Sequence, residues 1–452
     1  MKILLVSHLF LPDYFSGTEI LTLHTALELQ SRGHEVQVLT GFPATGTLAD
    51  AERFDRYEYE GIAVTRFKHA HTPMGDQHNE AEQEYDNHLV AKKFAALLDE
   101  FQPDLVHFFH LMRISASVVD VCRVRGLPTV LTPTDFWFVC PTSQLRLPDG
   151  SMCPGPDALG ANCVRHLASL KMRGFAASAL EQLPAPLLAG VVRLAALAPL
   201  RPFKPFSLVA ALSRRQTFLK ERLNRMDRVL VPTRSMQQIL QRHGLDPARV
   251  QFCPYGIRLP KLPARAPRAS GPLRLGLIGI GEHKGAHVVI QAMRKLSDVD
   301  LALRIYGRES DFPDYVRRLK ALAGADPRVQ FSGSFPNDQI GLILSQLDVL
   351  LVPSLWFENA PLVIYSAQAA GVPVIASDVA GVAELISDGD NGRLFPAGDV
   401  DQLAGIIAAL AQDRDQIERY SERARMPKTI ASYVEELIAV YAELGVSAGR
   451  SS

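Results

Sequence analysis

The chain of 452 residues lacks several features that would assign it quickly to a class of protein. It contains no run of about 18 or more uncharged apolar residues, so we expect no membrane-spanning helix. Neither charge is in excess, with 48 basic and 48 acidic side chains, which argues against a general nucleic-acid binder. The first apolar run, in "MKILLVSHLFLPDYFSG", is too short for an export signal and predicts a strand instead. We therefore expect a cytoplasmic protein.

Two nucleotide-binding fingerprints and a paired set of cysteines are also missing. The sequence before the first expected helix is "YFSGTE", not G-x-G-x-x-G, and no G-x-x-x-x-G-K-[ST] loop occurs. These absences argue against a nicotinamide-dependent or P-loop enzyme. The chain has only five cysteines, an odd number, which indicates reduced thiols in a protein without an export signal.

Alternating strand and helix patterns fill both halves of the chain. Buried-strand runs such as "KILLVS", "EVQVLT" and "DLVHFFH" occur in the first half, and "LRLGLIG", "DVLLVPS" and "VPVIAS" occur in the second. This alternation is typical of parallel sheets that are covered by helices on both faces. Residues 258–272 are rich in proline without any periodicity, which predicts a linker between two domains. Two such domains in tandem provide a cleft for a nucleotide and a second substrate.

The stretch "SLWFENAPLVIYSAQAAGVPVIAS" (354–377) places a carboxylate between a strand and a helix. Pro361 suits the first turn of a helix, and Gly371 suits its end. Glu358 and Asn359 then lie in the loop at the carboxyl end of a strand, where open parallel sheets bind ligands. The free N–H groups at the helix start form an anion site. The alternative is a surface glutamate that complements the helix dipole, worth about 0.3–1 kcal/mol.

Several of these motifs together resemble the retaining family 4 glycosyltransferases of the GT-B fold. The similar pieces extend along nearly the whole chain and include "FLPDYFSGTE", "VLTPTDFWFVCP", "EHKGAHVVIQA" and, most specifically, "LWFENAPLVIYSAQAAGVPVIASDVAGVAELISDGDNGRLFPAGD". The resemblance implies an α/β fold of two doubly wound, Rossmann-like parallel-sheet domains that face each other across a cleft. Residues 1–257 would form the acceptor-binding domain, with a helical insertion at about 167–206 and the final helix, 428–445, packing back on it. Residues 271–427 would bind the nucleotide sugar.

The resemblance also implies roles for individual residues in transferring a sugar from a nucleotide-diphosphate donor to an acceptor with retention. Lys284 and the helix that starts near Pro361 would neutralise the diphosphate without a catalytic metal. Glu358 and Asn359 would orient the donor sugar, while Asp135 and His110 would face the acceptor. We expect Glu358, Lys284 and Asp135 to be the catalytic residues. The expected donor-binding residues are Gly17, Lys284, Arg308, Glu358, Asn359, Ala360, Pro361 and Ser366.

The chain departs from the family pattern at three positions. Ser366 stands where the motif has a second glutamate, and Thr134 stands where a histidine often precedes the aspartate. No arginine precedes Lys284 in its loop, and Arg308 is a weak substitute as the second phosphate ligand. We interpret these changes as altered substrate preference. The alternatives are a non-catalytic sugar-nucleotide-binding subunit and, third, a sugar-nucleotide epimerase of the same fold.

Two features lie outside the family motif. Cys140, Cys153, Cys163 and His166 follow a C-x12-C-x9-C-x2-H pattern within turn-rich segments, which suits a structural zinc ion. The alternative is a set of unpaired thiols.

The second feature is the segment 167–206, which is apolar and carries five basic side chains against one acidic side chain. It predicts either peripheral contact with an anionic membrane, where lipid-linked acceptors reside, or a helical lid on the first domain. A glycan or lipid-linked glycan in cell-surface polysaccharide synthesis is the expected acceptor, and no nucleic acid is expected as a partner.

Overall fold

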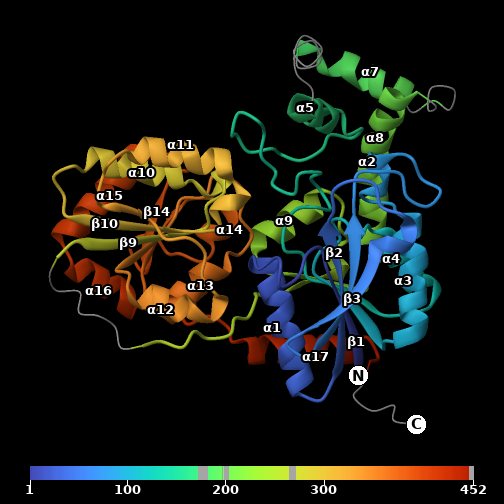
Figure 1. Ribbon diagram of the computed structural model, residues 1–452, viewed down its shortest axis with the longest axis horizontal. Coiled ribbons are helices and arrows are strands. Elements are labelled where there is room, and N and C mark those ends of the chain that lie inside the picture. The colour runs from blue at the N-terminus through green and yellow to red at the C-terminus, as the bar shows by residue number, and fades with distance from the viewer. Residues whose placement is uncertain (172–181, 196, 198–202, 264–270, 447–452) are drawn as a thin grey trace. The chain divides into compact units, whose positions relative to one another are not determined.

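The computed structural model describes residues 1–171, 182–195, 197, 203–263 and 271–446 (Figure 1). The chain divides into two compact units, Met1–Pro254 together with Ala431–Ser452, and Tyr255–Ile430. The first unit therefore ends slightly before residue 257, because Tyr255 is buried in the second unit and Ile257 pairs there with Thr429. Much of the expected linker, residues 264–270, lies outside the described residues, as do residues 172–181, 196 and 198–202 of the expected insertion.

The first unit is built on an eight-stranded sheet with the order β3-β4-β2-β1-β5-β6-β7-β8. All neighbouring strands are parallel except the β3–β4 pair, which is antiparallel. The central strands are continuous apolar runs because both of their faces are covered by helices. The strands are β1 (Lys2–Ser7), β2 (Glu35–Pro43), β3 (Phe54–Tyr59), β4 (Ile62–His69), β5 (Leu105–Phe108), β6 (Thr129–Leu131), β7 (Arg228–Val231) and β8 (Val250–Phe252).

Helices of the first unit come from both ends of the chain. The last helix, α17, packs on this unit. The hydroxyl of Tyr441 on α17 lies 2.6 Å from Nδ1 of His107 on β5. The hydroxyl of Tyr433, also on α17, lies 3.3 Å from that of Thr132. The helices of this unit are α1 (Gly17–Ser31), α2 (Glu80–Gln83), α3 (His88–Phe101), α4 (Ser117–Val124), α5 (Ala161–Lys171), α7 (Ala185–Ala195), α8 (Lys204–Leu223), α9 (Arg234–Arg242) and α17 (Ile430–Glu443).

The second unit has a fully parallel six-stranded sheet with the order β11-β10-β9-β12-β13-β14. In Figure 1, α10, α11 and α15 lie on one side of this sheet, and α12, α13 and α16 lie on the other. The strands are β9 (Leu273–Ile278), β10 (Leu301–Tyr306), β11 (Val329–Phe331), β12 (Val349–Val352), β13 (Val374–Ser377) and β14 (Gly392–Phe395). The helices are α10 (Ala286–Lys295), α11 (Pro313–Ala323), α12 (Ile340–Ser345), α13 (Leu362–Ala369), α14 (Ala380–Ala383), α15 (Val400–Gln412) and α16 (Asp415–Glu422).

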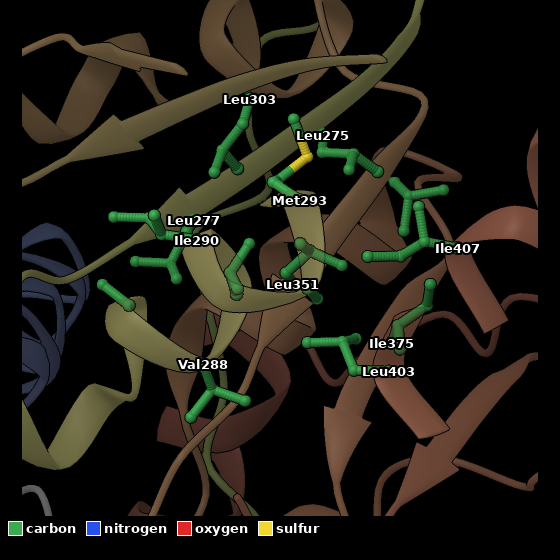
Figure 2. Packing of buried hydrophobic residues seen from close by; sticks show 14 of the residues in the cluster. Leu275, Leu277, Val288, Ile290, Met293, Leu303, Leu351, Ile375, Leu403 and Ile407 are labelled. Carbon is green, nitrogen blue, oxygen red and sulfur yellow. The ribbon is translucent and has the colours of Figure 1, made fainter. Parts of the chain in front are cut away.

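The core of the second unit fixes how α10 and α15 lie on the sheet. Figure 2 shows leucines of β9, β10 and β12 packed against side chains of both helices. Val288, Ile290 and Met293 of α10 and Leu403 and Ile407 of α15 are buried there. Burial of an aliphatic or methionine side chain contributes roughly 1.5–3 kcal/mol, so this layer holds the β9–α10 connection firmly in place.

Each sheet reverses its winding between two neighbouring strands, at β1–β5 in the first unit and at β9–β12 in the second. Ligands of open α/β sheets bind outside the carboxyl ends of the strands at such points. These two sheets confirm the predicted α/β fold with two doubly wound parallel domains. Among the helices that the structure describes, none combines the length and the apolar composition needed to cross a membrane.

Candidate functional site

The reversal point of the second sheet brings together two residues that are far apart in the sequence, Lys284 and Glu358. Lys284 ends a short 3-10 helix, Glu282–Lys284, in the loop after β9, and Glu358 lies in the loop after β12. Gly285 follows Lys284 with a φ of 75° and is the residue that directly precedes α10. A Cβ at Gly285 would lie only 2.0 Å from the carbonyl oxygen of Pro353. Only glycine therefore lets the two loops approach this closely.

Glu358 is 5% exposed and makes two short contacts through one carboxylate oxygen. Its Oε1 accepts hydrogen bonds from Lys284 Nζ at 2.5 Å and from Ser354 Oγ at 2.8 Å. Burial by itself raises the pKa of the Glu358 carboxyl, but the charge of Lys284 and the hydrogen bonds from Lys284 and its neighbours together outweigh burial, and the net effect lowers the pKa. Glu358 is therefore a buried, ionised and oriented carboxylate, not a surface glutamate that complements a helix dipole.

The residues after Glu358 hold the loop in place and start the predicted helix. Asn359 Nδ2 donates a hydrogen bond to the Tyr255 hydroxyl at 2.8 Å, and Ala360 is buried. A Cβ at Gly381 would lie 1.7 Å from the Asn359 carbonyl oxygen, so the loop lies directly against the start of α14. Pro361 is the residue that caps α13, which runs from Leu362 to Ala369 and confirms the predicted helix.

Two other expected donor-site residues of this unit lie nearby in the fold. Ser366 is half-buried in α13, and its hydroxyl donates to the Leu362 carbonyl at 3.1 Å. Arg308 follows β10, half-buried, at the start of a 3-10 helix. A Cβ at Gly307 would lie 2.8 Å from Ile280 Cβ, so the Arg308 loop lies against the loop that carries Lys284.

In the first unit, His110 and Asp135 form a pair at the carboxyl ends of β5 and β6. His110 Nε2 lies 2.6 Å from Asp135 Oδ2, and the other ring nitrogen accepts the Met112 backbone N–H at 3.0 Å. That second bond places the proton of a neutral ring on Nε2, so His110 donates to Asp135. The Trp137 backbone N–H donates to Asp135 Oδ1 at 2.8 Å. Asp135 is thus held on both oxygens, and His110 positions it.

Sequence reasoning missed two groups beside this pair, the half-buried His8 and the buried Glu19. The rings of His8 and His110 are 4.1 Å apart, and His8 Nε2 lies 3.7 Å from Glu19 Oε1. Both carboxylate oxygens of Glu19 are buried without a hydrogen-bond partner among the described residues. Burial raises the pKa of the Glu19 carboxyl. The sequence signal was present, because His8 directly follows the first strand and Glu19 follows Gly17 in "SGTE".

Two other residues of the first unit that the sequence analysis singled out are Gly17 and Thr134. Gly17 is the first residue of α1, and the preceding Ser16 makes no side-chain cap, so it leaves the N–H groups of the first turn uncapped. The Thr134 hydroxyl donates to the Phe109 carbonyl at 3.4 Å, across from β5. Thr134 therefore bonds to the end of β5, whereas its neighbour Asp135 bonds to His110.

The four expected zinc ligands are brought together by the fold. Cys140 and Cys153 come from the loop after β6, and Cys163 and His166 come from α5. All four line one small cavity of about 10 Å³. Within the described ranges of the chain, no three histidine, cysteine or acidic side chains lie close enough to one another to hold a metal ion as they stand. Cys122 and Cys253 are buried elsewhere, as expected for core residues.

Comparison with family models gives a match in each unit. Residues 16–156 match the model described as "Glycosyl transferase 4-like domain", and residues 277–426 match the model described as "Glycosyl transferases group 1". The first match contains Gly17 and Asp135, and the second contains Lys284 and Glu358.

Two curated relatives resemble part of the chain. The protein WcaL of Salmonella typhimurium, named as a colanic acid biosynthesis glycosyltransferase, is 29% identical over 197 residues, which cover 41% of this chain and 48% of WcaL. A D-inositol 3-phosphate glycosyltransferase of Nocardia farcinica is 30% identical over 224 residues, covering 45% of this chain and 49% of the relative. The chain thus spans about half the length of the curated relatives it matches.

A solved structure resembles the whole chain. The HepE protein of Anabaena, determined in complex with UDP and glucose, has a TM-score of 0.63 at 16% identity, and the match covers 98% of this chain and 99% of HepE. At that identity the likeness shows the shared fold.

Proposed function

Because this chain belongs to the family 4 glycosyltransferases of the GT-B fold, we propose that it transfers a sugar from a nucleotide-diphosphate donor to an acceptor with retention of the anomeric configuration. The observation that carries the proposal is the pair of Lys284 and Glu358 at the reversal point of the second sheet. A half-buried ammonium beside a buried carboxylate suits a ligand that is anionic at one end and rich in hydroxyls at the other.

The donor diphosphate would be bound by the positive groups at this sheet edge. Lys284 supplies an ammonium, and the backbone N–H groups at the start of α13 supply a favourable dipole. Glycosyl transfer builds negative charge on the departing phosphate, so groups that are fixed in advance stabilise the transition state more than the ground state. The fold fixes Lys284 through Gly285 and the close approach to Pro353.

The donor sugar would be oriented by Glu358. Its carboxylate accepts hydrogen bonds only, and the hydroxyls of a sugar are donors. Lys284 and Glu358 neutralise each other through their 2.5 Å contact, and donor binding would redirect the ammonium to phosphate and the carboxylate to sugar hydroxyls. Ser354, which donates to the same carboxylate oxygen, keeps Glu358 oriented during that exchange.

Asp135 would contact the acceptor. Its side chain is 20% exposed, whereas its partner His110 is almost completely buried. A carboxylate already held by His110 and the Trp137 N–H retains lone pairs for an acceptor hydroxyl. In this arrangement Asp135 orients the acceptor, and His110 is a positioning residue.

The relatives support a class of donor and of acceptor. HepE binds UDP and glucose, which supports a nucleotide-diphosphate sugar as the donor. WcaL is named for colanic acid biosynthesis, which supports a glycan or lipid-linked glycan in cell-surface polysaccharide synthesis as the acceptor. We extend both classes to this chain as part of the proposal.

A peripheral contact with an anionic membrane is the further part of the proposal. On α7, Leu188 and Val192 are buried against α5, while Leu187, Val191 and Leu194 are exposed. The exposed three are spaced by four and three residues, so they share one helix face. Arg193 on the same helix is exposed as well. An apolar face with a basic side chain suits the surface of a membrane that presents lipid-linked acceptors.

One pair of measurements tests the proposed reaction. Nucleotide sugars are first screened for thermal stabilisation of the protein, and nucleotide release is then followed with glycan and lipid-linked acceptors. We expect at least one donor to stabilise the protein and to be consumed, with the product anomer matching the donor anomer by NMR. An inverted anomer would overturn the retaining mechanism.

A non-catalytic sugar-nucleotide-binding subunit is the second candidate. It is favoured by Ser366, whose hydroxyl is bonded within α13 where the family motif has a glutamate. Stabilisation by a donor without nucleotide release for any acceptor tested would support this candidate. Conversion of one nucleotide sugar into another without an acceptor would instead indicate an epimerase.

A further inference from the structure

The cavity that Cys140, Cys153, Cys163 and His166 line lies outside the proposed donor and acceptor residues. The fold assembles it from three segments. Cys140 lies in the loop after β6, and Cys153 lies beyond a tight turn that is closed by the bond from Leu147 N–H to the Ser151 carbonyl at 2.8 Å. Cys163 and His166 are three residues apart on α5, so they face the same side of that helix.

We propose that these four side chains hold one zinc ion and that the buried guanidinium of Arg215 is the charge partner of the metal site. Three thiolates and one imidazole are ligands that Zn²⁺ prefers in tetrahedral structural sites. The inference does not depend on the proposed sugar transfer.

The size of the cavity fits a single small atom. Its volume of about 10 Å³ is close to the lower limit for one water-sized sphere. The zinc–sulfur distance is about 2.3 Å, and the four side chains lie farther apart than a bound ion requires. Ligation therefore requires these side chains to close around the ion.

Arg215 is a buried cation that lies close to the cysteine cluster. It lies on α8, is 3% exposed, and its Nε has no hydrogen-bond partner among the described residues. Its terminal nitrogen donates to the Trp137 carbonyl at 2.6 Å. No described carboxylate forms an ion pair with Arg215, and the groups of opposite charge that act on it from farther away are Glu84 first and then the sulfurs of Cys140 and Cys163.

The charge of a zinc site matches this arginine. A buried cation is costly unless a negative charge compensates it. Neutral thiols provide no such charge, whereas Zn²⁺ with three thiolates and a neutral imidazole carries about one negative charge. Arg215 and the metal site would therefore neutralise each other, which favours both the ionised thiolates and the buried guanidinium.

Two hydrogen-bonding groups lie beside the sulfurs. The Gly155 backbone N–H donates to Cys153 Sγ at 3.4 Å, and the Thr142 hydroxyl lies 3.2 Å from Cys140 Sγ. Hydrogen bonds to an ionised acceptor are stronger than those to a neutral one. A Cβ at Gly155 would lie 2.2 Å from His243 Nε2, so glycine is needed for the backbone to reach this position.

The metal would fasten the loop of Asp135 to the helices that follow it. Cys140 is five residues beyond Asp135, and Trp137 between them contacts Arg215 through its carbonyl and its ring. Cys163 and His166 belong to α5, which packs on α7 and α8. Zinc binding would thus contribute to the folding free energy of this part of the first unit.

Metal analysis and cobalt spectroscopy test the ligand set. Full-length protein purified without chelators is expected to contain about one zinc per chain, and Co²⁺ exchange is expected to give the absorption bands of a tetrahedral thiolate site. Cys163→Ser should lose both signals, while the matched controls Cys122→Ala and Cys253→Ala should keep them. Wild-type protein with neither zinc nor cobalt bands, or Cys163→Ser with full zinc content, would overturn the site.

Chelator competition tests the role of Arg215. Loss of a group that supports a metal site from outside its ligands lowers metal affinity about 10- to 100-fold, and we expect this from Arg215→Gln. Arg215→Lys keeps the charge and should restore most of the affinity. The neighbouring Arg214 is exposed and pairs with Glu82, so Arg214→Gln is the matched control and should bind zinc like the wild type. Equal zinc affinity in Arg215→Gln and wild type would overturn the charge partnership.

Discussion

At the scale of single residues, the contact between Lys284 and Glu358 changes what a substitution of either one is expected to do. Glu358 is buried and ionised because Lys284 compensates it. Removing one charge therefore leaves the other without its partner, and the two variants should differ in which part of the donor they affect.

Glu358→Gln should weaken binding of the complete nucleotide sugar while leaving free nucleotide diphosphate at least as tightly bound. The amide cannot accept charge-assisted hydrogen bonds from sugar hydroxyls, which are worth about 1.5–3 kcal/mol, so the donor should bind roughly tenfold or more weakly. Lys284 would at the same time be released for phosphate. Calorimetric titration of both ligands checks this. If the diphosphate loses as much affinity as the sugar nucleotide, Glu358 does not contact the sugar.

Lys284→Ala should nearly abolish turnover while the protein stays folded. The lost neutralisation of the leaving phosphate is comparable with a lost oxyanion-hole donor, at roughly 2–4 kcal/mol of transition-state stabilisation. Initial rates of nucleotide release measure this effect. Lys320→Ala, which removes an exposed lysine paired with Glu309, is the control and should turn over normally. A near-normal rate in Lys284→Ala would remove this lysine from the donor site.

At the scale of elements, the order of strands explains why the site residues meet. Loops that follow β9 and β12 leave the second sheet in different directions, and the same holds for β1 and β5 in the first sheet. Lys284 and Glu358 come from the first pair of loops, and His8 and His110 come from the second. The docking of α17 on β5 includes the contact of Tyr441 with His107, a group that can take up a proton.

The attachment of α17 should weaken as the pH falls from 7 to 5. Burial lowers the pKa of His107 to about 3, and the imidazole contacts Tyr441 of α17. Between pH 3 and the ordinary histidine pKa of about 6.5, the unfolded chain binds more protons at this residue than the folded chain does. Stability is therefore lost as the pH falls, by about 2 kcal/mol between pH 7 and pH 5.

Urea unfolding at the two pH values measures the contribution of His107. His107→Gln should lower stability at pH 7 and should flatten the pH dependence by about the same 2 kcal/mol. His88→Gln, at an exposed histidine that pairs with Asp76, should keep the wild-type slope. An unchanged slope in His107→Gln would show that this histidine is not a buried neutral group.

At the scale of the whole molecule, the two units carry different parts of the proposed reaction. The second unit holds the charged pair for the donor, and the first unit holds Asp135, the cysteine cluster and the exposed face of α7. Transfer to a lipid-linked acceptor would require the first unit to reach a membrane surface.

Binding to anionic lipid vesicles should depend on the exposed face of α7. Replacing Leu187 and Leu194 by glutamate adds two negative charges and removes apolar area, so co-sedimentation with anionic vesicles should fall several-fold. Leu342→Glu changes an exposed leucine of the second unit and serves as the control. Vesicle binding that is absent in the wild type, or equal in the α7 variant, would contradict membrane contact through this face.

The sequence by itself determined the α/β class and much of the donor site. Apolar runs at a strand period, separated by helix-length segments, are local signals, and the "FENAP" stretch marks a loop between a strand and a helix because Pro361 and Gly371 act locally. Lys284 and Glu358 could both be named, since each belongs to a continuous motif that resembles the family. The four residues of the cysteine cluster lie outside the family motif and were named from their own spacing, which suits zinc ligands.

Only the tertiary structure decided how these residues are joined. That Lys284 neutralises Glu358 depends on the order of β9 and β12 in the sheet and on the space left by Gly285. The ends of β1, β5 and β6 are neighbours in the sheet. For this reason His110 holds Asp135, and His8 and Glu19 lie beside that pair. The burial of Arg215 beside the cysteines likewise arises from packing of α8. Short-range patterns set which residues begin and end an element, whereas burial, charge compensation and partner choice arise between segments distant in the chain.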